Sequence, residues 1–368
     1  MRTDEVEGFQ EAQVVLPCSE LDETLSFFTE RLGFRVEAIH PADSPRVAVV
    51  SGYGLRIQFE RGREGPPGVI RLRCTNLSAR AGSPKELRAP NGTRIELVEA
   101  DPPIVMPRVE PSFVLSESSD EATWGAGRAG MRYRDLVPDR QGGFLVASHI
   151  QIPDGGPVPD YVHFHKIRFQ MIYCYKGWVR VVYEDQGLPF VLEAGDCVLQ
   201  PPRIRHRVLE SSPGLEVIEI GCPADHETFA DYDLDLPTPT LRPQRSFDGQ
   251  RFVRHEAATA VWLPWRLEGF ECRDTGIAAA TGGLASVRVA RRNQTPPEAL
   301  CRHDAELLFM FVLDGSLELE VEGHDRHHLV PGTAFVLPAS LGHGFSGCST
   351  DLELLEVSLP AGFATNRV

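Results

Sequence analysis

The chain has 368 residues and carries 52 acidic against 37 basic side chains, so its formal net charge is −15. This acidity argues against binding to nucleic acid or to anionic membrane surfaces, because both would repel the protein. The length is sufficient for two or three domains with cores of their own. The 33 glycines and 29 prolines suit many short strands joined by turns.

Cysteine usage and the N-terminus point to a reducing compartment. The eight cysteines include no CxxC pair and no dense cluster, which argues against a disulfide framework and against a zinc ribbon. The N-terminus is acidic and lacks a basic stretch followed by an apolar core, so we expect no signal peptide. No apolar run reaches transmembrane length. We therefore expect a cytoplasmic protein that does not contact membranes.

The first hundred residues predict a small α+β unit. VVLPC reads as a strand, and SELDETLSFFTERLGF reads as an amphipathic helix with Ser19 as N-cap and Gly33 at its end. Three segments rich in strand formers follow, FRVEAIH, RVAVVSG and LRIQFER. The expected element order is βαβββ.

This order, together with LSFFTERLGF and APNGTRIELVE, resembles the vicinal oxygen chelate superfamily of glyoxalases and extradiol dioxygenases. The family's metal-ligand positions correspond here to Gln13, Glu60 and Glu96, and no histidine stands near Val69. The second module is also too short for a full helix. We therefore expect residues 1–104 to form a degenerate glyoxalase-like domain that serves as a scaffold or dimerisation element.

The central segment GPVPDYVHFHKIRFQMIYCYKG places polar ligands at strand spacing. His163 and His165 are two residues apart, so they point to the same face of one strand. FQMIYCY predicts the return strand of a hairpin that carries Gln170 back beside them. His206, in GDCVLQPPRIRHRV, must arrive from another strand. Three imidazoles suit Zn, Fe, Ni or Cu and leave coordination positions open for water and substrate.

The two segments resemble the cupin motifs G(X)5HXH(X)3-4E(X)6G and G(X)5PXG(X)2H(X)3N. The resemblance implies a small double-stranded β-barrel that binds one divalent transition metal, whether Fe, Zn, Ni, Mn or Cu. Position by position, it implies the ligands His163, His165, Gln170 and His206. The chain departs from the motifs in three ways. Gln170 replaces the family's Glu, six residues rather than five separate Gly156 from His163, and Arg203 stands at the position of a Gly.

Replacing the ligand Glu by Gln170 changes the chemistry expected of the site. All ligands become neutral, so the bound ion keeps about two positive charges and should attract anionic or enolate-like substrates. An amide also cannot accept a proton, which makes the site poor in bases. Tyr161 and Arg168 flank the motif and are candidate catalytic residues that could hold a substrate oxygen or carboxylate.

The same pattern recurs 137 to 140 residues further along the chain. Arg134-Asp135 recurs as Arg273-Asp274, and the motif positions recur with Cys301, His303, Leu308 and His343 in place of the metal ligands. The chain therefore resembles a bicupin. We expect a first barrel at residues 105–235, a Pro-rich linker at 236–250 and a second barrel at 251–368.

The second site is altered, because Leu308 and Cys301 replace two of its ligands. Cys301, His303 and His343, with Glu306 nearby, could still hold zinc or iron. The alternative is a barrel retained for packing and dimerisation.

The predicted fold is mainly β, with two tandem cupin jelly-roll barrels after a shortened glyoxalase-like domain. The predicted function is a metal-binding bicupin enzyme that oxidises a small enol, diketone or phenolic compound with dioxygen. One alternative is a Lewis-acid isomerase, lyase or cyclase at the same metal. Another is a non-catalytic protein that binds a small ligand, including a cupin that has lost its metal. We expect a homodimer and a small-molecule ligand, which the cationic metal would allow to be anionic.

Overall fold

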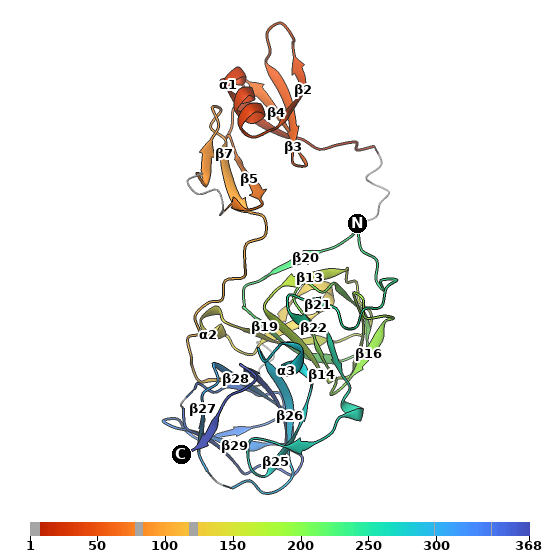
Figure 1. Cartoon of the computed structure of the whole chain (residues 1–368), viewed down its shortest axis with the longest axis vertical. Helices are drawn as coiled ribbons and strands as arrows, with labels where there is room; N and C mark the ends of the chain where they lie inside the picture. Colours follow the sequence, from red (N-terminus) through yellow and green to blue (C-terminus); the bar gives the residue numbers. More distant parts are fainter. Residues whose placement is uncertain (1–7, 78–83, 118–123, 298, 340) are drawn as a thin grey trace. The chain divides into compact units, whose positions relative to one another are not determined.

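The computed structural model describes residues 8–77, 84–117, 124–297, 299–339 and 341–368 (Figure 1). The chain divides into two compact units, Met1–Pro103 and Ile104–Val368. Each unit has a hydrophobic core of its own, and each is described separately below.

The first unit contains a four-stranded sheet of order β1-β4-β3-β2, in which β1 and β4 are parallel. Its strands are β1 (Val14–Cys18), β2 (Arg35–His40), β3 (Val47–Gly52) and β4 (Leu55–Arg61). Helix α1 (Leu21–Ser26) follows β1 and continues as the π-helical segment η2 (Phe27–Arg31). It buries Leu21 and Phe28, and Phe28 packs on Phe59 with ring centroids 4.8 Å apart. The predicted βαβββ order is thus present.

The N-terminal end of the helix differs from the prediction, whereas Gly33 follows the helix as expected. The N-cap residue is Glu20, which makes no side-chain capping bond, so the prediction of Ser19 was wrong by one residue. Gly33 follows the helix with a φ of +77°, a left-handed conformation that glycine adopts without steric cost.

A second, three-stranded sheet completes this unit, and its order is β5-β7-β6. The strands are β5 (Val69–Cys74), β6 (Glu86–Arg88) and β7 (Arg94–Glu99). The side chains at the three predicted ligand positions form hydrogen bonds or ion pairs with neighbouring residues. Gln13 donates to Gln58, Glu60 accepts from Gln58 and Arg63, and Glu96 pairs with Arg71 and Arg94. No cluster of metal-ligating side chains occurs among the described residues of this unit, and its relation to the glyoxalase family remains a prediction.

The second unit is built from two β-barrels, each made of a larger and a smaller sheet. The larger sheet of the first barrel contains β9 (Gly125–Ala126), β10 (Arg132–Asp135), β11 (Val146–Ile152), β14 (Phe169–Lys176), β17 (Cys197–Leu199), β19 (Leu215–Cys222) and β23 (Val253–His255). The smaller contains β12 (Gly156–Pro157), β13 (His163–Lys166), β15 (Trp178–Tyr183), β16 (Phe190–Glu193), β18 (His206–Ser211) and β20 (Glu227–Ala230).

The second barrel repeats this arrangement. Its larger sheet contains β8 (Val114–Ser116), β24 (Leu263–Pro264), β25 (Phe270–Asp274), β26 (Ser286–Arg292), β28 (Leu307–Asp314), β31 (Ala334–Val336) and β33 (Glu353–Leu359). The smaller contains β27 (Cys301–His303), β29 (Leu317–Val321), β30 (His327–Leu329), β32 (His343–Ser346) and β34 (Thr365–Arg367). The hairpin β21 (Ser246–Phe247) and β22 (Gln250–Arg251) lies between the barrels in sequence. The short helices are η5 (Arg128–Gly130), α2 (Arg140–Gly143), η6 (Ala257–Thr259) and α3 (Ile277–Ala280).

The two seven-stranded sheets have matching strand orders, and each is completed by a strand from the segment that precedes the other barrel. They run β23-β17-β14-β19-β11-β10-β9 and β8-β31-β28-β33-β26-β25-β24. Strand β23, which comes just before the second barrel in sequence, pairs with β17 of the first. Strand β8, which comes before the first barrel, pairs with β31 of the second. Strand pairing therefore does not follow chain order at the edges of the barrels.

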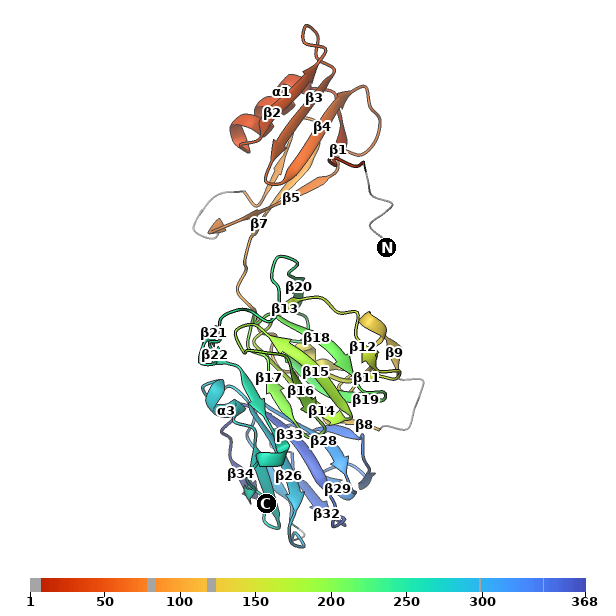
Figure 2. The ribbon, with the colours of Figure 1, turned by 90° about the vertical axis from the view of Figure 1, so that its right-hand side faces the viewer.

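The larger sheets of the two barrels lie next to each other (Figure 2), and one hydrophobic core contains side chains from both. Phe169 and Met171 on β14 share it with Phe309 and Phe311 on β28, and all four are fully buried. Because strand side chains alternate, the other face of each sheet lines the interior of its own barrel. The fold is mainly β. Among the described residues, no helix is long and apolar enough to cross a membrane.

Candidate metal centre

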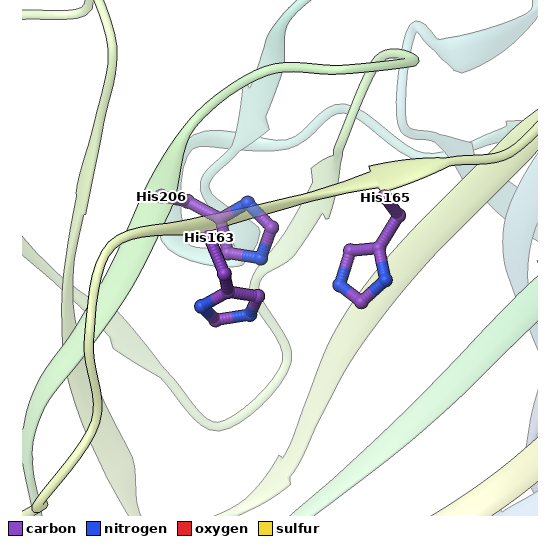
Figure 3. A group of neighbouring side chains, drawn as sticks. All are labelled: His163, His165 and His206. Atoms are coloured by element: carbon purple, nitrogen blue, oxygen red, sulfur yellow. The ribbon is translucent and has the colours of Figure 1, made fainter. Parts of the chain in front are cut away.

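Strands β13 and β18 bring three histidines together inside the first barrel. His163 and His206 lie directly opposite each other in the antiparallel pair, and His165 lies two residues further along β13. One ring nitrogen of each lies within 4.8 Å of the others (Figure 3). His163 and His206 are buried, and His165 is partly exposed. This is the one cluster of three or more such ligands in the described part of the chain.

Each of the three imidazoles is oriented through its Nδ1 atom. His163 Nδ1 donates to the Tyr161 carbonyl at 2.8 Å, and His206 Nδ1 donates to the Ile204 carbonyl at 3.0 Å. His165 Nδ1 lies 2.8 Å from the hydroxyl of Thr228, its partner on β20. A proton on Nδ1 leaves the lone pair on Nε2, which is the form that binds a metal. The donor set therefore fits a divalent transition ion.

The histidines open into a cavity of about 350 Å³ within the barrel. Its walls are mostly aliphatic, supplied by residues such as Ile150, Ile172, Val181, Leu192 and Val217. Its polar lining includes Tyr183, Gln200, Glu219, His226 and Thr228. Burial raises the pKa of Tyr183, whose hydroxyl accepts a hydrogen bond from Gln200 at 2.8 Å. That phenol is therefore neutral at physiological pH.

Gln170 is buried on the inner face of β14, but its amide nitrogen is committed to another residue. It donates to Glu219 Oε1 at 2.6 Å, so only its carbonyl oxygen could serve as a ligand. Glu219 lies on the neighbouring strand β19 and lines the cavity. The expectation of a base-poor site is therefore corrected. Glu219, on the strand next to β14, supplies a carboxylate in contact with the residue that replaces the motif's Glu.

The two candidate catalytic residues from the sequence do not line the cavity. The Tyr161 side chain is 40% exposed and packs beside His163 and Tyr232, while its carbonyl orients His163. The Arg168 backbone bonds to Cys222 and Gln250. The Tyr161 ring thus contacts His163 without lining the cavity, and a catalytic role for Tyr161 or Arg168 remains a prediction.

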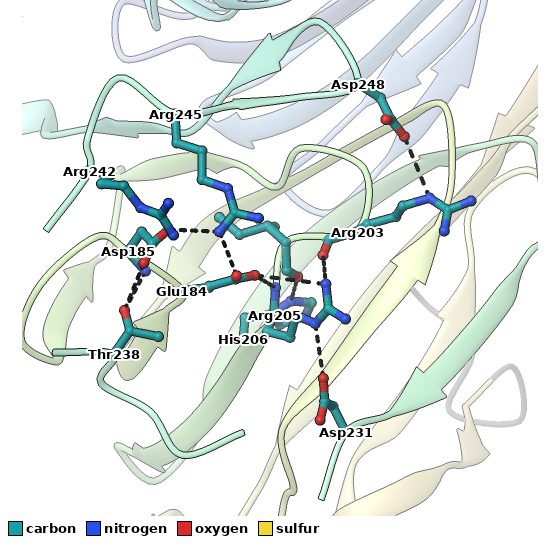
Figure 4. Close-up of polar contacts among 11 residues, drawn as sticks. Glu184, Asp185, Arg203, Arg205, His206, Asp231, Thr238, Arg242, Arg245 and Asp248 are labelled. Atoms are coloured by element: carbon teal, nitrogen blue, oxygen red, sulfur yellow. Dashed lines mark hydrogen bonds and ion pairs between the residues drawn. The ribbon is translucent and has the colours of Figure 1, made fainter. Parts of the chain in front are cut away.

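An ion-pair network surrounds the start of β18, where His206 lies (Figure 4). Arg205 pairs with Asp231 at 3.0 Å, and Arg245 pairs with both Glu184 and Asp185. Burial alone would raise the pKa of Asp185, but hydrogen bonds from Arg245, Arg242 and Thr238 lower it overall. The network ties the segment that follows the first barrel in sequence to the strand that carries a candidate ligand.

Arg203 occupies the glycine position of the second motif and keeps the backbone conformation of a glycine. Its φ is +64°, which costs a residue with a Cβ about 1 kcal/mol. Its amide donates to the His165 carbonyl at 2.9 Å, and its side chain pairs with Asp248 at 3.6 Å. These contacts hold the strained turn beside the ligand strand.

The second barrel brings together only part of its predicted site. The Cys301 thiol donates to His343 Nε2 at 3.3 Å, because His343 Nδ1 is committed to the Leu341 carbonyl. His303 uses both ring nitrogens on the backbone, donating to the Leu337 carbonyl and accepting from the Ala305 amide. Glu306 is exposed. Within the described chain these four residues do not form a metal-binding cluster.

Bulky side chains fill the interior of the second barrel where the first has its cavity. Leu308 and Met310 on β28 take the places of Gln170 and Ile172, and Phe335 and Phe345 pack against them in one buried cluster. A smaller cavity of about 260 Å³ remains beside Cys301 and His343, and Arg266 and Phe345 contribute to its lining.

The buried imidazole of His343 predicts an acid-sensitive second barrel. Burial lowers its pKa from 6.5 to about 4. The unfolded chain binds this proton more readily, so the contribution to stability is present above pH 6.5 and lost as pH falls towards 4, by about 3 kcal/mol in total. Urea denaturation at pH 7.5 and 5 should show this loss in the parent protein and a smaller one in His343→Gln. Equal losses in both proteins would contradict this assignment.

Glu219 is the site residue that motif reasoning missed, although the internal repeat contains a signal for it. EVIEIG at 216–221 aligns with ELLEVS at 353–358, so a glutamate recurs at Glu219 and Glu356. Both face the interior of a barrel, opposite Ile172 and Met310 respectively. His226 and Thr228 lie on or next to β20, for which the motifs give no sequence signal.

The comparisons with known proteins agree with this architecture. Residues 293–358 match the family model described as Cupin domain. A variant of salicylate 1,2-dioxygenase from Pseudoaminobacter salicylatoxidans is similar in structure, with a TM-score of 0.53 at 15% identity over 72% of this chain and 90% of that one. Oxalate decarboxylase from Lactobacillus farciminis, in a formate complex, gives a TM-score of 0.51 at 14% identity over 70% and 89%. No curated protein matches the sequence. At these identities the likeness establishes the fold alone.

Proposed function

We propose that this chain, with its cupin domain and bicupin fold, is a metal-dependent enzyme that acts on a small enol, diketone or phenolic compound in its first barrel. The observation that carries the proposal is the convergence of His163, His165 and His206 on a cavity large enough for such a molecule. The reaction we favour is a dioxygenase-type oxidation. The structural neighbours named above include a dioxygenase, which supports the choice by analogy.

The residues of the chain would hold the ion and shape its surroundings. The three imidazoles are fixed by their Nδ1 hydrogen bonds, so little reorganisation is needed when an ion binds. The ion, when bound, supplies Lewis acidity, open coordination positions and, for a redox-active metal, electron transfer. The aliphatic walls exclude water and strengthen electrostatic interactions inside the barrel. Glu219 provides the cavity with a hydrogen-bond acceptor.

Glu219 also keeps a Lewis-acid isomerase, lyase or cyclase as the second candidate. Its carboxylate lies in the cavity wall without being one of the three clustered ligands, where it could receive a substrate proton. Such chemistry requires no oxidant. Oxygen consumption therefore separates the two candidates.

The proposal predicts that metal binding depends on the three histidines. His163→Ala and His206→Ala should each lower metal affinity by at least about 100-fold, because each removes a ligand. His226→Ala is the matched control, since His226 lines the same cavity outside the cluster and should leave metal content unchanged. Metal content is measured after purification without chelators. No metal above background in the parent protein would refute both enzyme candidates.

If metal is bound, oxygen uptake is measured against a panel of diketones, catechols and flavonols. Uptake that disappears in His163→Ala but persists in His328→Ala, whose side chain is exposed on the second barrel, supports the oxygenase. Conversion of a panel compound without oxygen uptake supports the Lewis-acid candidate. Homodimerisation, a cytoplasmic location and a scaffold role for residues 1–104 remain predictions.

A further inference from the structure

Glu219 is the one carboxylate among the described residues that line the largely aliphatic cavity of the first barrel. Its Oε1 accepts the Gln170 amide at 2.6 Å, and the residue lines the same cavity as the three histidines. Among the described residues no further hydrogen bond or ion pair is formed by its Oε2. Glu219 is partly exposed, so this oxygen is accessible to a donor that enters the cavity.

The second barrel has a carboxylate at the equivalent position, and its surroundings differ from those of Glu219. Glu356 occupies the equivalent place on β33 and is 1% exposed. Arg266 donates to its Oε2 through both Nε and Nη2, Arg288 Nη1 lies 4.0 Å from its Oε1, and Arg266 lines the adjoining cavity. In the first barrel the carboxylate of Glu219 has the neutral amide of Gln170 as its partner, and it lines the cavity.

The cavity contains little that would attract a carboxylate substrate apart from the metal. Of its described lining residues, Arg140 alone carries a guanidinium; it is exposed and pairs with Asp135 at 3.4 Å. Most of the remaining wall is aliphatic. A second carboxylate near Glu219 would be repelled in this low-dielectric space, whereas a hydroxyl would find an acceptor.

We propose that the first barrel takes a neutral molecule with an apolar body and an enol or phenol hydroxyl, and that this hydroxyl donates to Glu219. The inference deepens the proposed function and rests on a metal held by the three histidines. It reverses the expectation that a site with only neutral ligands attracts anions, because Glu219 adds a carboxylate to the lining of the same cavity.

The test compares two small oxygen ligands of similar size on the full chain loaded with zinc, which is redox-inert and prevents turnover. Catechol offers two hydroxyls, whereas salicylate offers one hydroxyl and a carboxylate. Isothermal titration should show catechol binding at least about 10-fold more tightly than salicylate. Glu219→Gln should reduce this ratio by about 10-fold. Glu219→Asp, which keeps the charge, should retain most of it.

Glu227→Gln is the matched control, because Glu227 lies exposed on β20 and its replacement changes the net charge equally. It should leave the ratio unchanged. The inference would be overturned if salicylate bound as tightly as catechol to the zinc-loaded protein. It would also be overturned if Glu219→Gln left the ratio of the two affinities unchanged. Failure to bind zinc would count against the proposed function instead, and the same ratio is then measured on metal-free protein.

Discussion

Replacing Arg266 with leucine is expected to destabilise the second barrel by about 3–5 kcal/mol, because it removes both hydrogen bonds to the buried Glu356 carboxylate and leaves Arg288, 4.0 Å away, as an ion-pair partner. Glu356 is 1% exposed and receives hydrogen bonds from Arg266 Nε and Nη2. Arg266 also lies over the rings of Trp265 and Phe363, so its aliphatic stem contributes packing that leucine partly replaces. Denaturant unfolding followed by circular dichroism measures the loss, and hydrogen exchange across Glu353–Leu359 locates it.

The double variant R266L/E356L is the control for this result. Removing both charges exchanges a buried ion pair for apolar side chains, which is often close to neutral. We expect the double variant to recover most of the stability lost in R266L. If R266L alone were as stable as the parent protein, the buried pair would have no structural role. Pairing with Arg266 would then not distinguish Glu356 from Glu219.

The second large effect is expected for Q170E, which restores the residue that the cupin motif has at this position. In this chain the new carboxylate would stand at the 2.6 Å hydrogen-bond distance from Glu219, inside the barrel. Two carboxylates cannot share that contact while both are ionised. We expect the metal-free protein to lose about 2–3 kcal/mol of stability, measured in the presence of a chelator.

Exchanging both members of the pair should reverse this loss. Q170E/E219Q places the carboxylate on β14 and the amide on β19, which preserves one charged hydrogen bond between the strands. A double-mutant cycle of Q170E, E219Q and the exchange should therefore show a coupling energy of about 1–3 kcal/mol. Additive effects would show that the two side chains do not depend on each other.

Much of the site could be predicted from local patterns. The two-residue spacing of His163 and His165 places both on one strand face whatever the tertiary fold. The internal repeat predicted two barrels and an altered second site, and the pairing of equivalent strands agrees with the repeat. The helix after β1 was also predicted, apart from its N-cap at Glu20.

Other features depend on which strands become neighbours. The position of Gln170 beside the histidines stays a prediction, and its hydrogen bond to Glu219 connects residues 49 positions apart. The reciprocal exchange of β8 and β23 between the barrels was not predicted, because strands of three residues carry almost no periodic signal. The selection of Tyr161 and Arg168 rested on proximity in sequence, which does not indicate which side chains face a cavity.

The sequence by itself determined the ligand strand, the repeat and the absence of a carboxylate at position 170, since each is a property of residue types at short, fixed spacing. The tertiary structure decided the charge of the site, because the pairing of β14 with β19 sets Glu219 beside Gln170. It also decided that the first barrel has a cavity of about 350 Å³ at its three histidines, whereas the second keeps about 260 Å³ beside Cys301 and His343 and packs Leu308 and Met310 into its core. Both outcomes depend on how side chains from distant segments meet inside a closed sheet, and local spacing does not specify those contacts.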